Sequence, residues 1–283
     1  MRLVARALSV ALVAAALAWP RAASAHDHWL EAEPFWNQTP GREKIYLFVG
    51  DALEGAQPYV VKSRAHYTRF VVASKAGRRD VLSDMREDAT PLALLTSGQS
   101  TGSFVVALDA APRTLELDAK KFGAYLLEER LIDVLLDRAQ KAKEDAPGRE
   151  RYTRYMKAIV QIGDKPDATP TQALGQELEI VPDTNPYAVP RGAELGVRVL
   201  FQGKPLAGRA VTAVNRFRGE TSRQTVRLDS KGHAAFTLGK PGDWMIRLVH
   251  MEPSATPDVD WRSYWSNVTF SLPDATPAPA PRR

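Results

Sequence analysis

Short apolar runs, each ended by turn residues, dominate the first part of the chain. Runs rich in β-branched and aromatic residues alternate with turns such as Gly50-Asp51 and Lys75-Ala76-Gly77. This pattern is typical of β-strands with at least one buried face. We expect strands at residues 44–49, 67–73, 103–108 and 114–117.

One segment departs from this pattern and predicts a helix near residues 119–145. Its apolar residues recur at a spacing close to 3.6, with acidic residues between them. Residues 151–162 then return to a strand pattern. Residues 164–175, which contain Gly, Asp, Pro and Thr, predict a linker. We therefore expect a first, β-rich domain at residues 26–163.

The pattern after the linker is clearer and predicts a β-sandwich at residues 176–272. Short strands separated by Gly- and Pro-containing turns are typical of that architecture. Residues 273–283, rich in Pro and Ala, are expected to form a disordered tail. The fold class expected is mainly β, with two β-sandwich domains and one helical segment between them. The strands expected in the second domain are 178–181, 195–201, 211–214, 225–228, 233–238, 244–251 and 264–272.

The first 25 residues predict a cleavable signal peptide. Arg2 and Arg6 precede an apolar run over 7–19, and Ala23-Ser24-Ala25 supplies the small-x-small pattern of a cleavage site. The run is too short for a permanent span, which needs about 20 apolar residues. We expect a mature protein that begins at His26, is periplasmic or secreted, and has no permanent membrane span after cleavage.

The composition of the chain limits its possible partners and activities. The chain has 38 Lys and Arg, of which three lie in the predicted signal, so 35 remain against 33 Asp and Glu, a net charge of +2. No basic run interleaved with aromatic residues remains, which argues against nucleic acid as a partner. The chain has no Cys, so thiol catalysis and disulfides are excluded. Motifs of serine hydrolases, phosphate-binding loops and zinc proteases are also missing, and we expect no enzymatic activity.

The best candidate chemistry lies at the predicted mature terminus. Cleavage would give His26 a free α-amine with a pKa of about 7.7, and His28 follows two residues later. The amine, two backbone nitrogens and the His28 imidazole could form the planar nitrogen set that suits Cu(II) or Ni(II). Alternatively, the amine and side chain of His26 could chelate together, with another imidazole closing the site. The competing interpretation is two ordinary polar residues on an exposed terminus.

His250 is the best third ligand. Period-two alternation places it on one face with Trp244, Ile246 and Leu248, at the end of a strand. The competing interpretation is a histidine at the edge of the core that is hydrogen-bonded to backbone.

Several motifs are spread along the mature chain: His26-Asp27-His28-Trp29-Leu30, Leu115-Glu116-Leu117, Arg149-Glu150-Arg151-Tyr152, Gly203-Lys204-Pro205-Leu206-Ala207-Gly208, Pro241-Gly242 with Trp244, His250-Met251 and Ser263-Tyr264-Trp265. Together they resemble domain-of-unknown-function family 4198. The resemblance covers essentially the whole mature chain and implies export, a mostly β architecture and a link to nickel and cobalt transport. The second half is also similar to transthyretin-like and carboxypeptidase-regulatory-like sandwiches, so the expected sandwiches are of the immunoglobulin-like or transthyretin-like type.

The function expected is a periplasmic protein that binds a divalent transition metal, nickel or cobalt with copper as the further choice, through His26, His28 and His250. It would act in metal uptake or delivery, with a membrane metal transporter as its partner. One alternative is a structural or interaction protein of the cell envelope without metal chemistry. A second is a carbohydrate-binding module, for which five tryptophans would form an aromatic wall: Trp29, Trp36, Trp244, Trp261 and Trp265.

Overall fold

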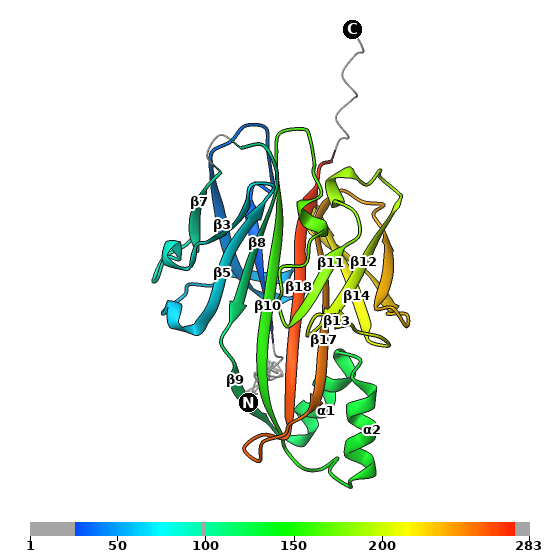
Figure 1. Cartoon of the computed structure of the whole chain (residues 1–283). Coiled ribbons are helices and arrows are strands. Elements are labelled where there is room, and N and C mark those ends of the chain that lie inside the picture. The colour runs from blue at the N-terminus through cyan, green and yellow to red at the C-terminus, as the bar shows by residue number, and fades with distance from the viewer. Residues whose placement is uncertain (1–25, 98–99, 275–283) are drawn as a thin grey trace, which may run out of the picture.

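The computed structural model describes residues 26–97 and 100–274. Within them the chain is mainly β, as predicted, with strands in three sheets and two helices at one end (Figure 1). No helix of these residues is long and apolar enough to cross a membrane. The predicted signal peptide, and the predicted tail beyond residue 274, lie outside the described residues.

The three sheets are named here the first, central and third sheet. The first sheet contains β1 (Asp27–Glu33), β3 (Arg42–Asp51), β4 (Glu54–Pro58) and β7 (Ala93–Thr96). The central sheet contains β2 (Trp36–Asn37), β5 (Tyr67–Ser74), β6 (Gly77–Asp80), β8 (Gly102–Ala110), β9 (Arg113–Leu117), β10 (Gly148–Ile162), β14 (Ala210–Phe217), β15 (Glu220–Arg227), β17 (Gly242–Pro253) and β18 (Trp261–Leu272). The third sheet contains β11 (Leu178–Pro182), β12 (Glu194–Phe201), β13 (Lys204–Pro205) and β16 (His233–Thr237).

The central sheet runs through both halves of the chain. Its strand β10 pairs in parallel with β18, from Glu150 opposite Trp261 to Ala158 opposite Thr269. The first sheet packs on one face, over Met156 and Val160, and the third sheet packs on the other. The two predicted sandwiches are therefore present but share one sheet, and the predicted linker at 164–175 does not separate them. Because both faces are covered, β10 is buried at every position from 155 to 162 and β18 at every position from 263 to 270, although both strands contain polar residues.

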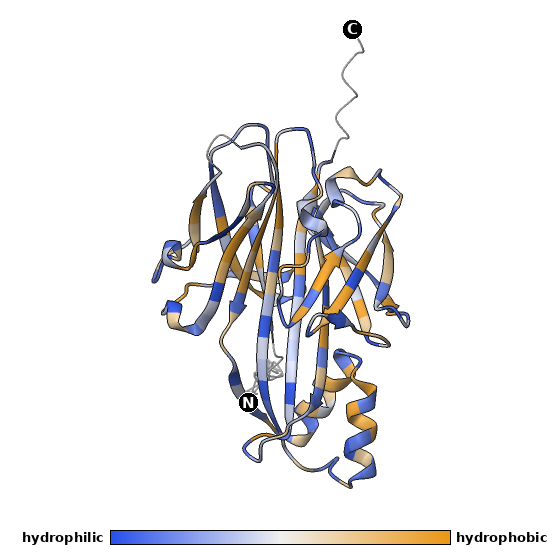
Figure 2. Cartoon of the chain, viewed as in Figure 1, coloured by the Kyte–Doolittle hydropathy of each residue, from blue (hydrophilic) through white to orange (hydrophobic). Residues whose placement is uncertain are grey.

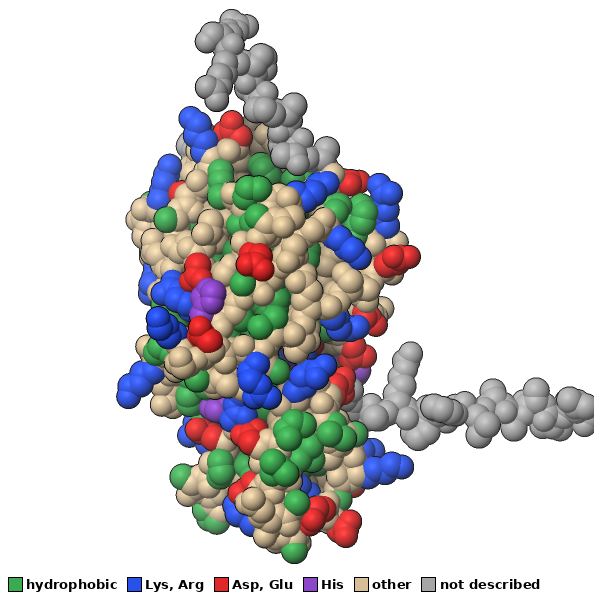
Figure 3. Space-filling model, turned by 90° about the vertical axis from the view of Figure 1, so that its right-hand side faces the viewer, with side chains coloured by type: hydrophobic (Ala, Val, Ile, Leu, Met, Phe, Trp, Pro, Cys, Tyr) green, Lys and Arg blue, Asp and Glu red, His purple; other side chains and the backbone are tan. Residues whose placement is uncertain are grey.

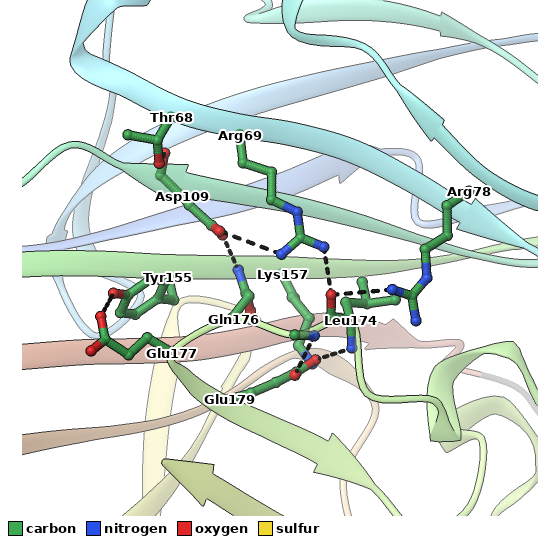
Figure 4. A network of polar contacts seen from close by, with 11 residues as sticks. Thr68, Arg69, Arg78, Asp109, Tyr155, Lys157, Leu174, Gln176, Glu177 and Glu179 are labelled. Carbon is green, nitrogen blue, oxygen red and sulfur yellow. Dashed lines mark hydrogen bonds and ion pairs between the residues drawn. The ribbon is translucent and has the colours of Figure 1, made fainter. Parts of the chain in front are cut away.

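A buried polar network joins the predicted linker to the central sheet (Figure 4). The Lys157 ammonium lies 3.0 Å from Glu179 Oε1. Glu179 also accepts hydrogen bonds from the backbone N–H groups of Leu174 and Gly175, at 2.6 and 2.9 Å. Gln176 donates to Asp109 of β8 at 2.6 Å. These bonds fix the start of the third sheet against β8 and β10.

Two helices, α1 (Ala119–Glu128) and α2 (Ile132–Gln140), occupy the segment for which one helix was predicted. Asp118 caps α1 by accepting from Lys121 N at 2.9 Å. The break follows from Arg130, which has a left-handed φ of 56°. Figure 2 shows hydrophobic and hydrophilic positions alternating around α2.

Both helices bury one face against the ends of β17 and β18. The buried residues of this contact are Leu117, Phe122, Tyr125, Leu126, Leu131, Val134, Val249, Met251, Trp261 and Trp265. The outer face is unusual, because three large apolar side chains stay exposed there: Leu127, Ile132 and Leu136. Figure 3 shows apolar side chains gathered on this lobe among charged ones.

Close packing of α1 against β10 gives a first prediction. A Cβ on Gly148 would clash with the Phe122 ring, whereas a Cβ on Gly123, within α1, would meet nothing within 4 Å. Gly148→Ala should therefore destabilise the fold by about 1–3 kcal/mol through overpacking. Gly123→Ala should stabilise it by about 0.5–1 kcal/mol, because alanine is the better helix former. Urea unfolding of the two variants tests this, and equal effects would contradict the packing described.

Candidate functional site

The start of β1 is held along both of its edges. One edge pairs with β3, and Asp27 lies opposite Gly50 in that register. Three carbonyl groups on the other edge accept hydrogen bonds from side chains of the central sheet, so these backbone acceptors have partners. These bonds run from Arg154 to the His26 carbonyl at 3.2 Å, from Asn267 to the His28 carbonyl at 2.7 Å, and from Thr269 to the Leu30 carbonyl.

His26 is positioned beside Asp51 by this register. Because Asp27 faces Gly50, the preceding residue falls next to Asp51, the last residue of β3. The His26 Nδ1 atom lies 2.8 Å from Asp51 Oδ1, and the two side chains are 50% and 58% exposed. The chain turns sharply after Asp51, through Ala52 and Leu53 with left-handed φ of 47° and 72°. Two polar side chains therefore meet at an accessible point of an otherwise well-anchored backbone.

Asp27 points the other way, into a buried ion-pair cluster. Arg247 of β17 contacts the Asp27 carboxylate at 2.9 Å and the Glu129 carboxylate at 2.7 Å. Arg247 is 13% exposed, and both carboxylates are 9% exposed. The Arg247 guanidinium also lies over the Trp265 ring, 5.8 Å from its centre. This cluster ties the start of β1 to the end of α1.

A cavity of about 360 Å³ adjoins the cluster and reaches Asp51. Its charged walls are formed by Asp27, Asp51, Glu128, Glu129, Arg130, Arg223 and Arg247. The carboxylates outnumber the guanidinium groups there by four to three, so the approach to Asp51 carries no excess of positive charge.

His28 is half-buried in different surroundings. Its ring lies 4.9 Å from the Tyr59 ring, and it lines a small cavity with His66. Burial, together with the guanidinium groups of Arg154 and Arg113, lowers the pKa of His28 to about 3. The imidazole is therefore neutral at physiological pH. Two guanidinium groups nearby nonetheless make the position unfavourable for a cation.

Residues 23–252 match a family model described as a domain of unknown function, DUF4198. The chain belongs to this family. No curated protein matches the chain. The DUF4198 match includes His26, Asp51, Arg154 and His250, and it confirms the family suggested by the sequence motifs.

In this DUF4198 protein, His250 does not approach His26 or His28. It lies on the face of the central sheet that packs against the third sheet, whereas the first sheet covers the opposite face. Its ring contacts the Phe201 ring at 4.5 Å, and Nδ1 accepts a hydrogen bond from Arg209 at 3.1 Å. Burial and Arg209 lower its pKa to about 4. The expected ligand set of His26, His28 and His250 is therefore not brought together.

The planar four-nitrogen arrangement expected for His26-Asp27-His28 also conflicts with the fold. Successive backbone nitrogens can bind one metal only when the ψ angle between them is near zero, whereas a strand has ψ near about 135°. Asp27 and His28 are strand residues paired with β3. Among the described residues, no three His, Cys, Asp or Glu side chains gather closely enough to hold a metal ion. The other expected geometry, chelation by the amine and side chain of His26 with a second imidazole closing the site, is compatible with this backbone in its His26 part, but the side chain beside His26 is the Asp51 carboxylate and not an imidazole.

Sequence reasoning missed the residues that position His26. Asp51 was assigned only to a turn, and Arg154 and Asn267 were not linked to β1. The pairing of β1 with β3 was the missing information, because β1 itself was not predicted as a strand. The aromatic wall is not formed either, because four of the five tryptophans are buried and Trp36 alone is half-buried.

Proposed function

We propose that the processed protein binds a divalent transition-metal ion at its N-terminus, with the α-amine and Nδ1 of His26 and the carboxylate of Asp51 as ligands. The supporting observation is the 2.8 Å separation of His26 Nδ1 and Asp51 Oδ1. Two ligands at right angles on a metal, each about 2.0–2.1 Å from it, are about 2.9 Å apart. The contact thus has the spacing of neighbouring ligands.

The nitrogen involved also supports this proposal. Nδ1 is the ring nitrogen nearest the main chain and can close a six-membered chelate ring with the amine of the same residue. That amine would be created by cleavage after Ala25, and with a pKa of about 7.7 it is partly neutral near pH 7. Two nitrogens and one carboxylate suit nickel and copper; cobalt follows from the family resemblance.

The surroundings favour an exchangeable ion. Both side chains are about half exposed, so water can fill the remaining coordination positions and a partner can reach the ion. We therefore propose metal uptake or delivery in the periplasm, with a membrane metal transporter as the partner. No covalent chemistry is proposed.

Calorimetric titration with Ni(II) and Cu(II) tests the site. Protein that begins at His26 should bind these ions with a sub-micromolar Kd. Acetylation of the His26 α-amine removes this ligand without creating a new terminal amine and should weaken binding about 100-fold or more, which corresponds to about 2.7 kcal/mol. Asp51→Asn should weaken it at least about tenfold, as expected for loss of a ligand contact.

His233 supplies the matched control. It forms another half-exposed His–Asp pair, with Nε2 2.7 Å from Asp183 Oδ2, but it has no adjacent amine. His233→Ala should leave metal affinity unchanged. Equal and weak binding by the free and the acetylated terminus would exclude the site. The alternative of an envelope interaction protein would then be favoured, and its contact surface would be sought at Leu127, Ile132 and Leu136.

A further inference from the structure

A groove of about 680 Å³ lies at the end of β1 farthest from His26. It is bounded by β1, β2, β3 and the adjoining ends of β17 and β18. Its volume is in the range of small-molecule sites. We infer that this groove binds an organic ammonium ion. The inference is independent of the proposed metal site.

Aromatic rings form one part of the groove. Trp36, Tyr46 and Phe48 line it and stay half-buried, with 6.0 Å between the ring centres of Tyr46 and Phe48. All the other tryptophans of the described residues are buried in the core. Ring faces attract cations, and more strongly so where water is partly excluded.

The charged residues around the groove indicate a cationic ligand. Glu31, Glu33 and Asp243 line the groove. Arg216 does not line the groove, but its guanidinium lies 2.9 Å from both Glu31 and Asp243, so the three carboxylates and Arg216 together carry a formal charge of −2. The Arg191 guanidinium also lies outside the lining and donates a hydrogen bond to the Pro273 carbonyl at 2.8 Å. Lys44 lies opposite Glu33 on β3 but does not line the groove. A cation gains from the carboxylates and the rings together, whereas an anion would be repelled.

Of the three carboxylates, Glu31 would be stabilised most by a bound cation. It is 14% exposed and shares Arg216 with Asp243. Burial raises the pKa of Glu31 even though Arg216 opposes that rise. A second cation in the groove would offset this desolvation.

Choline and its neutral isostere 3,3-dimethylbutan-1-ol test the inference, because they share a shape and differ in charge. Titrations followed by tryptophan fluorescence and calorimetry should give a Kd for choline below about 1 mM and binding of the isostere at least about tenfold weaker. Glu33→Gln, at the exposed rim, should weaken choline binding about three- to tenfold and leave the isostere unaffected. Tyr46→Leu should weaken choline binding at least about threefold.

Glu194→Gln, an exposed carboxylate on β12, is the matched control and should leave choline binding unchanged. All variants should unfold at the same urea concentration as the parent. Choline binding that is no tighter than binding of the isostere, or that is unaffected by Glu33→Gln, would overturn the inference. Preferential binding of the neutral sugar maltotriose would also overturn it and would identify a sugar site.

Discussion

Lys157→Met is expected to destabilise the protein by about 3–5 kcal/mol, as is typical when one partner of a buried ion pair is removed. The Lys157 and Glu179 side chains are 2% and 1% exposed, and their charged atoms lie 3.0 Å apart. Without the ammonium, a carboxylate would remain buried with only the backbone N–H groups of Leu174 and Gly175 as donors. Urea denaturation at pH 7 measures the loss.

The same pair predicts how the loss depends on pH. Burial alone would raise the pKa of Glu179, but the Lys157 ammonium and the two backbone N–H groups outweigh it and hold the pKa below its usual range. In the parent, this contribution to stability is present above the unfolded-state pKa of about 4.3 and is lost as pH falls through the folded-state value. In Lys157→Met, burial dominates and raises the pKa of Glu179. The deficit should therefore shrink between pH 7 and pH 5.

Two control variants separate charge from packing. Leu174 N and Gly175 N bond to different oxygens of Glu179. The double variant Lys157→Met with Glu179→Gln therefore removes the lone charge but keeps an acceptor for only one of these N–H groups, so it should recover part of the stability. Lys62→Met breaks an exposed pair with Asp88 and should change stability little. A deficit that is independent of pH, and equal in the single and double variants, would show that packing rather than charge is responsible.

The regular parts of the fold could be predicted because their apolar side chains face a core and their polar side chains face solvent. Strands such as β5, β12 and β17 carry apolar residues toward a core, so their positions could be predicted from the chain alone. β1 could not, because it is enclosed by specific partners rather than by apolar surface alone. Its Asp27 and Glu31 are covered by Arg247 and Arg216, whose positions depend on the fold.

The shared central sheet also could not be predicted from the sequence. The pairing of β10 with β18 joins residues more than a hundred positions apart, and nothing in either strand specifies its neighbour. Two separate sandwiches were therefore predicted where the structure has two that share a sheet.

The candidate site was predictable only in part. His26 was identified because a cleavage motif precedes it, which is local information. Asp51 is 25 residues away and comes near His26 only through the register of β1 with β3. His250 was placed correctly on its strand face, with Trp244, Ile246 and Leu248, but that face turns away from the first sheet. Period-two alternation separates the two faces of a strand but does not show which sheet each face meets.

Arg247→Met is expected to be as damaging as Lys157→Met, because it would leave two buried carboxylates without their cation. Asp27 and Glu129 are each 9% exposed, and Arg247 joins them across β1, β17 and α1. We expect a loss of about 3–5 kcal/mol at pH 7 in urea denaturation. Arg151→Gln, which breaks an exposed pair with Asp258, is the matched control and should change stability little.

The pH dependence of Arg247→Met identifies the cause of that loss. Burial already raises the pKa of Glu129, with Arg247 opposing it, so removing Arg247 should raise that pKa further. A carboxyl group with a raised folded-state pKa destabilises the fold fully above that pKa, and this destabilisation declines as pH falls from the folded-state pKa toward the unfolded-state pKa. The stability deficit of Arg247→Met should therefore narrow from pH 7 to pH 5.

The same variant should also change an aromatic signal. Tyr125 stacks on Trp265, with 5.7 Å between the ring centres, beside Arg247. The near-ultraviolet circular dichroism of these rings should therefore weaken as α1 loosens. An unchanged ring signal, together with a loss no larger than that of Arg151→Gln, would show that the cluster does not hold α1 against the start of β1.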